Sequence, residues 1–245
     1  MSKNFELLLR VAREDCFNLA DEPVPAPQKP RPAIPFKKAA PDAEITKLVQ
    51  RLFSQAGPDN GPRVVSFMGI TQDDRSRWIC ARAGEALAEQ VAASVCIVEA
   101  NVWSPQPRVH STATHQVGLA EALTANSPIR VFAMPLDAPN LWLIPAGSMK
   151  PGIHPPMEVV RERFAELREA FDFILISAPA FSQETEATIL GQLADGVVLI
   201  VEANHNRRET VRRAKEQLES AHVRILGAVL DQRTFPIPEK LYRRI

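Results

Sequence analysis

Short apolar runs alternate along the chain with segments of helical periodicity. The runs are rich in β-branched residues and begin near residues 64, 94, 141, 173, 197 and 225, as VVSFM, SVCIV, LWLIP, FILIS, VVLIV and ILGAVL. Such runs are typical of strands buried on both faces of a sheet. Between them, apolar residues recur every three or four positions, as at Val160, Phe164, Leu167 and Phe171. The alternation predicts an α/β domain whose doubly wound, mostly parallel sheet is flanked by helices.

The N-terminal part of the chain has a different pattern. Residues 5–13 (FELLLRVAR) predict a short helix within a segment spanning 1–20. Residues 21–41 contain closely spaced prolines, which fix φ and remove a backbone donor, so this stretch is predicted to be an extended Pro-rich linker. The linker is interpreted as a spacer, with a ligand for a proline-binding domain as the alternative. Helical periodicity resumes at about residue 42, so the α/β domain is predicted to span 42–245.

Net charge, hydropathy and cysteine spacing argue against several classes of protein. The 245 residues include 29 Lys plus Arg and 29 Asp plus Glu, so the net charge is zero and no nucleic-acid partner is expected. No apolar run reaches the roughly 20 residues that a bilayer span requires, and the N-terminus does not resemble a secretory leader, so the expected location is the cytoplasm. Cys16, Cys80 and Cys96 form no CxxC pair, which argues against a disulfide scaffold and a zinc site.

Ligands of open parallel sheets bind beyond the carboxyl ends of the strands. Four segments of this chain are expected there: GITQDDRSRW after Met68, EANVWSP after Val98, SAPAF after Ile176 and EANHNRRE after Val201. The first lies between a predicted strand and a predicted helix, which is the position of a phosphate-binding loop.

From about residue 42 the chain resembles the bacterial tyrosine kinases of capsular and exopolysaccharide synthesis, a family within the deviant P-loop ATPases. The phrases that carry the resemblance are VVSFMG, GEALA, SVCIVEANVWSP, GLAEAL, NLWLIPAG, FDFILISAP, ADGVVLIVEA and ILGAVLDQR, in the family's order. The resemblance implies a P-loop NTPase-like fold and ATP-dependent phosphorylation of tyrosine. It also implies an integral-membrane chain-length or co-polymerase protein as the partner.

The phosphate loop departs from the family's Walker A pattern, G-x-x-x-x-G-K-S/T. The resemblance places nucleotide binding on Gly69, Thr71, Gln72, Asp73, Asp74, Arg75, Ser76 and Arg77. Counted back from the helix phrase, Arg75, Ser76 and Arg77 replace the glycine, the lysine and the Mg²⁺-binding hydroxyl; counted from Gly69, the replacements are Asp74, Arg75 and Ser76. Neither alignment contains Gly-Lys. Arg75 and Arg77 could donate to phosphate, and an exposed, solvated loop is the alternative for both.

The family's acidic motifs are also altered. Glu99 and Asn101 match an Asp-x-Asp motif, and Ser177 stands where a second metal-supporting aspartate is expected. Neutral side chains do not supply the anionic oxygens that Mg²⁺ prefers, so no metal site and no confident catalytic residue is predicted. These losses argue against kinase activity, although ATP or ADP could bind with weak or no Mg²⁺. The sequence therefore predicts a pseudokinase that acts as a regulatory or scaffold partner; an autokinase with an unconventional phosphate loop and a partition-type ATPase relative are the alternatives.

Three smaller features complete the predictions. Tyr242, the chain's one tyrosine, is a candidate phosphoacceptor, with simple packing as the alternative. Glu44 and Lys47 have a spacing similar to that of the family's ring-assembly helix, which indicates a candidate homo-oligomer contact, with an ordinary exposed helix face as the alternative. The basic cluster at 207–215 is interleaved with glutamates and is interpreted as a solvated helix face.

Overall fold

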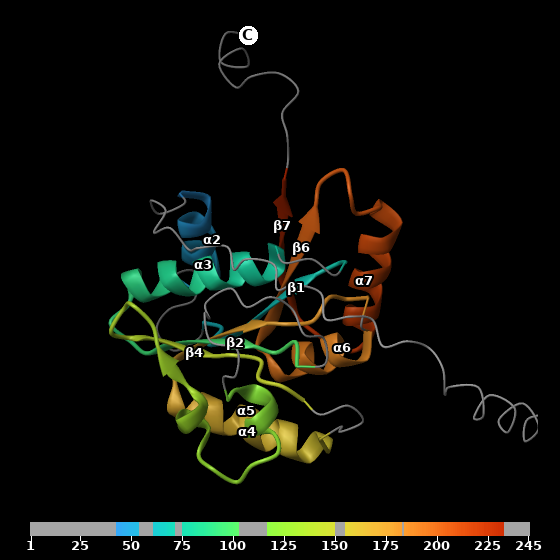
Figure 1. Cartoon of the computed structure of the whole chain (residues 1–245). Coiled ribbons are helices and arrows are strands. Elements are labelled where there is room, and N and C mark those ends of the chain that lie inside the picture. The colour runs from blue at the N-terminus through green and yellow to red at the C-terminus, as the bar shows by residue number, and fades with distance from the viewer. Residues whose placement is uncertain are drawn as a thin grey trace, which may run out of the picture. The chain divides into compact units, whose positions relative to one another are not determined.

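The computed structural model describes residues 43–53, 61–71, 75–102, 117–149, 155–182 and 184–232 (Figure 1). The predicted N-terminal helix, the Pro-rich linker, loop residues 72–74 and Tyr242 lie outside these ranges. Across the part of the chain that is described, no helix combines the length and the apolarity needed to cross a membrane.

A seven-stranded sheet, in the order β3-β4-β2-β5-β1-β6-β7, forms the centre of the α/β domain. The strands are β1 (Val64–Gly69), β2 (Val95–Glu99), β3 (Met134–Pro135), β4 (Leu141–Ile144), β5 (Phe173–Ser177), β6 (Gly196–Glu202) and β7 (Ile225–Asp231). All neighbours are parallel except β3 and β4, which pair antiparallel. The predicted mostly parallel, doubly wound sheet is confirmed, and five of the six predicted apolar runs form buried strands. The prediction is wrong for ILGAVL, which forms β7 at the edge of the sheet, where its residues are half-buried or exposed.

Helices cover both faces of this sheet. On one face, α2 (Ala43–Phe53) and α3 (Arg75–Gln90) pack over one apolar core. On the other face, a second core lies under α4 (Leu119–Ala122), a 3-10 turn (Ile129–Phe132), α5 (Met157–Ala170), α6 (Glu184–Leu193) and α7 (Arg208–Ser220). Cys80 and Cys96 are buried, one in each core, and their burial raises the pKa of both thiols.

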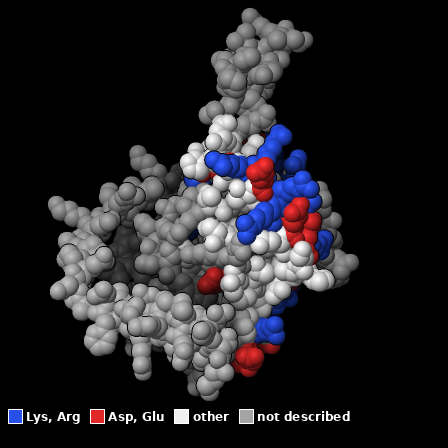
Figure 2. All heavy atoms as spheres, turned by 90° about the vertical axis from the view of Figure 1, so that its right-hand side faces the viewer, with Lys and Arg blue, Asp and Glu red and all other residues white. Residues whose placement is uncertain are grey.

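The basic cluster lies on α7 and at its first turn. Its arginines and Lys215 are exposed, and glutamates of the same helix lie among them (Figure 2). Arg212 pairs with Glu216 at 2.8 Å and Lys215 with Glu219 at 3.5 Å, both one helical turn apart. The predicted solvated helix face is confirmed.

The phrases GLAEAL and NLWLIPAG form one packed unit. Glu121 accepts hydrogen bonds from the backbone N–H of Gly118 at 2.8 Å and of Ser148 at 3.0 Å, and the N–H of Leu119 donates to the carbonyl of Pro145 at 2.8 Å. A Cβ on residue 118 would lie 2.1 Å from that carbonyl oxygen, so the contact requires glycine. The two segments therefore hold the loop after β4 in place.

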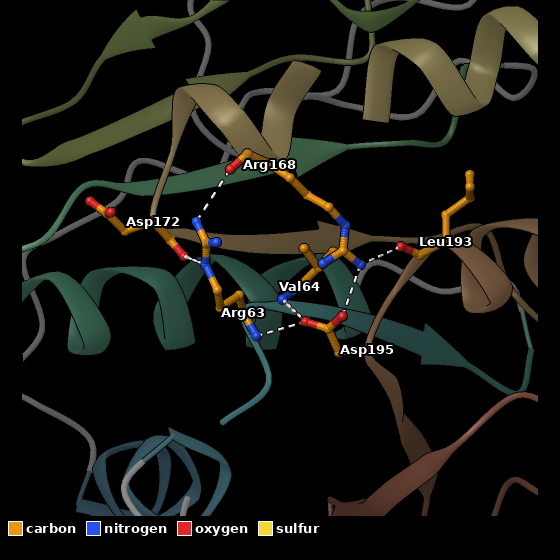
Figure 3. Close-up of polar contacts among 6 residues, drawn as sticks. All are labelled: Arg63, Val64, Arg168, Asp172, Leu193 and Asp195. Atoms are coloured by element: carbon orange, nitrogen blue, oxygen red, sulfur yellow. Dashed lines mark hydrogen bonds and ion pairs between the residues drawn. The ribbon is translucent and has the colours of Figure 1, made fainter. Parts of the chain in front are cut away.

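The amino-terminal edge of the sheet carries a polar cluster, which we call the amino-edge network: Arg63, Val64, Arg168, Asp172 and Asp195 (Figure 3). Asp195 accepts from the N–H groups of Arg63 and Val64, both at 2.7 Å, and from the Arg168 guanidinium at 2.9 Å. Arg63 in turn donates to the carbonyls of Asp172 at 2.9 Å and Arg168 at 3.2 Å. The network thus ties the start of β1 to the ends of α5 and α6.

The charge of Asp195 is stabilised within this network. Partial burial raises its pKa, but the hydrogen bonds from Arg168 and from the N–H groups of Val64 and Arg63 outweigh burial and hold the pKa below its usual value. At the starts of β2 and β5, the Ser94 hydroxyl and N–H donate to Asp172 at 2.7 and 2.8 Å, and these bonds lower the pKa of Asp172.

Candidate functional site

The carboxyl ends of β2, β5 and β1 lie side by side, as the sequence predicts. Glu99 at the end of β2 is in register with Ser177 at the end of β5, and Ser177 is also in register with Phe67 of β1. Glu99 is 3% exposed and Ser177 is 5% exposed. The structure therefore brings together two of the three positions that match the family's acidic motifs.

Asn101, the third of these positions, lies two residues after Glu99 at the end of β2. Its neighbour Ala100 donates its N–H to the Ser177 carbonyl at 2.9 Å, which holds the segment against β5. Within the described ranges, the buried Oδ1 of Asn101 has no hydrogen-bond partner. Unpaired buried polar atoms are costly and rare, so this amide oxygen marks an incompletely satisfied position at the sheet edge.

Arg75 begins α3, where the family would place its phosphate loop. Its guanidinium forms a bidentate ion pair with Asp231 at the end of β7, in which the Nε–Oδ2 distance is 2.5 Å and the Nη2–Oδ1 distance is 2.8 Å. It also lies over the ring of Trp78, 5.0 Å from the centroid. The hydrogen bonds from Arg75 hold the pKa of Asp231 below its usual value, so this arginine is already engaged with a carboxylate of its own chain.

Ser76 and Arg77 lie in the first turn of α3 and are 5% and 7% exposed, and each has a polar contact within the chain. The alternative of an exposed, solvated loop is therefore wrong for Arg77, because its side chain packs inside the domain. It is also wrong for Arg75, which is helical, paired with Asp231 and only 38% exposed. Whether either arginine contacts phosphate stays a prediction.

Gly69 and Thr71 are held in place at the end of β1. The Gly69 carbonyl accepts the N–H of Phe181 at 2.8 Å, and the Thr71 hydroxyl accepts the Asn206 amide at 3.1 Å. Asn206 also accepts the N–H of Glu202 at 2.7 Å, which links this loop to the end of β6. The loop residues Gln72, Asp73 and Asp74 lie outside the described residues.

The residues present do not fit a Mg²⁺ site of the family type. Of the three matching positions only Glu99 carries a charge, whereas Mg²⁺ in phosphoryl-transfer sites is held by carboxylates together with phosphate oxygens. No group of three His, Cys, Asp or Glu side chains in the described ranges could hold a metal ion. A phosphoryl-transfer step that requires Mg²⁺ therefore has no support from these side chains.

Two residues of this edge were missed by the sequence reasoning. Asp231 and Asn206 lie in the quoted phrases ILGAVLDQR and EANHNRRE but were given no role. The available signal was their position just after the ends of parallel strands. Their partners, Arg75 and Thr71, are 156 and 135 residues away in sequence, so the pairings could not be predicted.

The candidate oligomer residues Glu44 and Lys47 lie on the exposed side of α2. They form an ion pair at 2.8 Å, and this hydrogen bond lowers the pKa of Glu44. An oligomer contact through this helix stays a prediction, as does phosphorylation of Tyr242.

In comparisons with known proteins, parts of the chain are similar in sequence to bacterial tyrosine-protein kinases. It is 29% identical over 119 residues to the tyrosine-protein kinase CpsD of Streptococcus agalactiae, covering 47% of this chain and 51% of CpsD. It is 32% identical over 97 residues to the putative tyrosine-protein kinase CapB of Staphylococcus aureus, covering 38% and 42% of the two chains. The chain thus spans about half the length of these curated relatives. No profile of a known protein family matches it.

Solved structures show the same fold. The chimerical protein CapA2B2 aligns with a TM-score of 0.70 at 18% identity, covering 82% of this chain and 88% of that one. The VpsO kinase domain aligns at 0.67 with 20% identity, covering 78% and 94%. The cell division protein MinD of Aquifex aeolicus aligns at 0.58 with 17% identity, covering 74% and 72%, which supports a P-loop NTPase-like fold. In sequence the chain is thus similar to bacterial tyrosine-protein kinases, and it shares the fold of the solved kinase domains.

Proposed function

We propose that this protein is a catalytically degenerate kinase, a pseudokinase, that serves exopolysaccharide or capsule biosynthesis as a regulatory or scaffold component. The observation that carries the proposal is the chemistry of the strand ends. Glu99 is the one charged side chain at the three family-matching positions, and its register neighbour Ser177 is neutral.

The expected loss of rate is large. A single preorganised charge-stabilising group contributes about 3 kcal/mol to a transition state, roughly a hundredfold in rate. This chain lacks the loop lysine and two carboxylates, and phosphoryl transfer depends almost wholly on such positioning and charge. Arg75 does not replace the lysine without giving up its two hydrogen bonds to Asp231.

Calorimetric titration of the full chain with ATP and ADP, with and without Mg²⁺, tests the proposal directly. We expect no Mg²⁺-dependent binding in the micromolar range. Asp231→Ala is the matched variant, because it removes the ion pair of Arg75 with Asp231 while leaving Glu99 and Ser177 in place. Micromolar Mg²⁺-dependent binding by the unaltered chain, followed by phosphate incorporation at Tyr242, would instead establish the autokinase alternative.

Restoring the loop alone should not restore activity. In the double variant Arg75→Gly with Ser76→Lys, Asn101 and Ser177 still leave the metal without carboxylate ligands. We therefore expect no ATP-dependent phosphorylation by this variant. Robust phosphorylation would show that the loop defect alone silences the site and would refute the proposed loss of metal binding.

The proposed partner is an integral-membrane polysaccharide co-polymerase or chain-length protein, which the chain would meet on the cytoplasmic side. Co-purification of the full chain with such a membrane protein, expressed together with it, is the test. Recovery of DNA-segregation partners in its place would support the partition-type alternative.

The charge-swapped variant Glu44→Lys with Lys47→Glu, measured by sedimentation, tests α2 as a contact in a homo-oligomer.

A further inference from the structure

A groove of about 650 Å³ lies between α7 and the edge strand β7. Its floor is apolar and is formed by residues of β6, β7 and α7: Leu199, Val201, Val211, Ile225, Ala228 and Leu230. Leu230 is 53% exposed, one of three large apolar side chains with such exposure in the described ranges. This exposed leucine continues the apolar floor of the groove to the surface.

The rim of the groove is basic. Arg208, Arg212 and Lys215 line it, against a single carboxylate, Glu202 (Figure 2). Arg212 and Lys215 have glutamate partners on α7, but the four side chains are between 53% and 80% exposed, and exposed pairs of this kind exchange partners at little cost. Arg208 makes no ion pair with any described residue. The rim therefore favours an acidic occupant.

The strand beside the groove, β7, lies at the edge of the sheet formed by the described residues. β7 is the last strand of the sheet, and within the described ranges no strand pairs with its outer edge. An open edge presents unpaired backbone N–H and carbonyl groups, and an extended peptide can add to it as a further strand. Every second side chain of such a peptide would then point to the groove side of the sheet.

We propose that this groove and the β7 edge bind an extended segment of a partner protein in which every second side chain faces the groove, with apolar residues at the central groove-facing positions and Asp or Glu at the flanking ones. The apolar side chains occupy the floor around Ala228 and Leu230, and the flanking carboxylates meet Arg208, Arg212 and Lys215. The backbone of the segment pairs with β7.

Two other occupants fit less well. Residues 233–245 of this chain carry Arg233, Lys240, Arg243 and Arg244, which repel the basic rim, and Pro236 and Pro238 lack the N–H donors that edge pairing needs. A second copy placed edge to edge would bring two identical basic rims together. Both occupants are outcomes that the experiment separates from the proposal.

The test uses the full chain and three fluorescein-labelled peptides of about ten residues, the length that matches a strand edge. The first carries Glu, Val, Ile, Val and Glu at every second position with Ser between them, the second replaces each Glu with Lys, and the third is the Glu peptide with every second backbone nitrogen methylated. We expect the Glu peptide to bind and to shift the NMR signals of Ala228, Leu230 and Arg208. The Lys and methylated peptides should bind about tenfold more weakly or worse, because they lose charge complementarity and backbone pairing.

Matched variants locate the site. Leu230→Asp should weaken the Glu peptide about tenfold, since it places a carboxylate in the apolar floor. Val131→Asp makes the same chemical change at a residue that is 71% exposed and does not line the groove, and it should leave binding unchanged. Arg208→Glu should weaken the Glu peptide by a few fold and strengthen the Lys peptide.

Equal affinity for the Glu and Lys peptides, or an unchanged affinity in Leu230→Asp, would overturn the proposal. So would NMR contacts that place Phe235 or Tyr242 of the same chain in the groove, or a dimer in sedimentation that Leu230→Asp dissolves. Peptide binding is measured without nucleotide and without a kinase assay, so the result is independent of the proposed pseudokinase function.

Discussion

The two edges of the central sheet differ in how their polar groups are satisfied. At the amino edge, Asp195 and Arg63 bond mainly to backbone groups and hold β1 against the ends of α5 and α6. At the carboxyl edge, Glu99, Asn101 and Ser177 lie at strand ends, and the Asn101 oxygen has no partner in the described residues. The amino edge therefore supports the fold, whereas the carboxyl edge holds the candidate site.

The difference separates side chains that support the fold from side chains at the candidate site. Side chains that bond to the backbone stabilise the native chain whatever it binds, so the amino-edge network is independent of the chemistry at the other edge. At the carboxyl edge, Glu99 is the one charged side chain of its three positions, and Arg75 is engaged by Asp231. Removing a polar side chain should therefore cost more stability at the amino edge than at the carboxyl edge, whereas adding a charge beside buried Glu99 should be costly.

The largest effect is expected from Ser177→Asp. It places a second carboxylate in register with buried Glu99, so like-charge repulsion and burial should lower the free energy of unfolding by about 3 kcal/mol or more near neutral pH. The pKa of one carboxyl of the pair should rise, so stability should recover as the pH falls through that raised value. Urea denaturation at pH 8 and pH 5.5 measures both effects.

Ser177→Asn is the control for this variant, because it adds similar volume without charge. If both variants lose the same stability, volume rather than charge is responsible. A recovery of Ser177→Asp in millimolar Mg²⁺ that Ser177→Asn does not show would mean that one carboxylate rebuilds a cation site.

At the amino edge, Asp195→Ala should lower the free energy of unfolding by about 2–3 kcal/mol, because the N–H groups of Arg63 and Val64 and the Arg168 guanidinium lose their acceptor. Asp195→Asn keeps an acceptor for the N–H groups and should lose about half as much. Nucleotide or peptide binding should not change in either variant. A loss confined to binding would contradict a purely structural role for this network.

Asp195 should also make stability depend on pH, with a smaller effect than that of removing its side chain. The pKa of Asp195 is lower in the folded chain than in the unfolded chain, so its contribution is complete above the unfolded value of about 4 and is lost as the pH falls through the lower folded value. Denaturation midpoints between pH 5 and pH 3 should therefore fall less steeply in Asp195→Asn than in the unaltered chain. Parallel curves would show that Asp195 does not drive the acid sensitivity.

The smallest effect is expected from Asp231→Ala. Arg75 is 38% exposed and keeps its contact with Trp78, so the loss should be below about 1 kcal/mol. Thermal unfolding of this variant beside Asp195→Ala gives the comparison. A larger loss for Asp231→Ala would mean that the carboxyl edge, too, is part of the structural framework.

The sequence predicted much of the fold and the location of the site. Buried strands such as VVLIV and FILIS are identified by their apolar, β-branched runs, because a strand covered on both faces by helices has no polar side. Glu99 and Ser177 were expected to be neighbours because parallel strands end at a common edge. The family resemblance rests on short sequence segments, and related proteins keep such segments together with the fold.

Only the tertiary structure decided which partner each polar group has. Arg75 pairs with Asp231 across 156 residues, and Arg63 meets Asp195 across 132. Such pairs depend on strand order and on how helix ends pack, and neither is encoded in the spacing of apolar residues. The burial of Arg77 and the groove beside β7 also arise from packing between distant segments. The sequence by itself therefore determined the order of strands and helices along the chain and the edge of the sheet where the candidate site lies. The tertiary structure decided which charged side chains are paired and where the exposed groove lies.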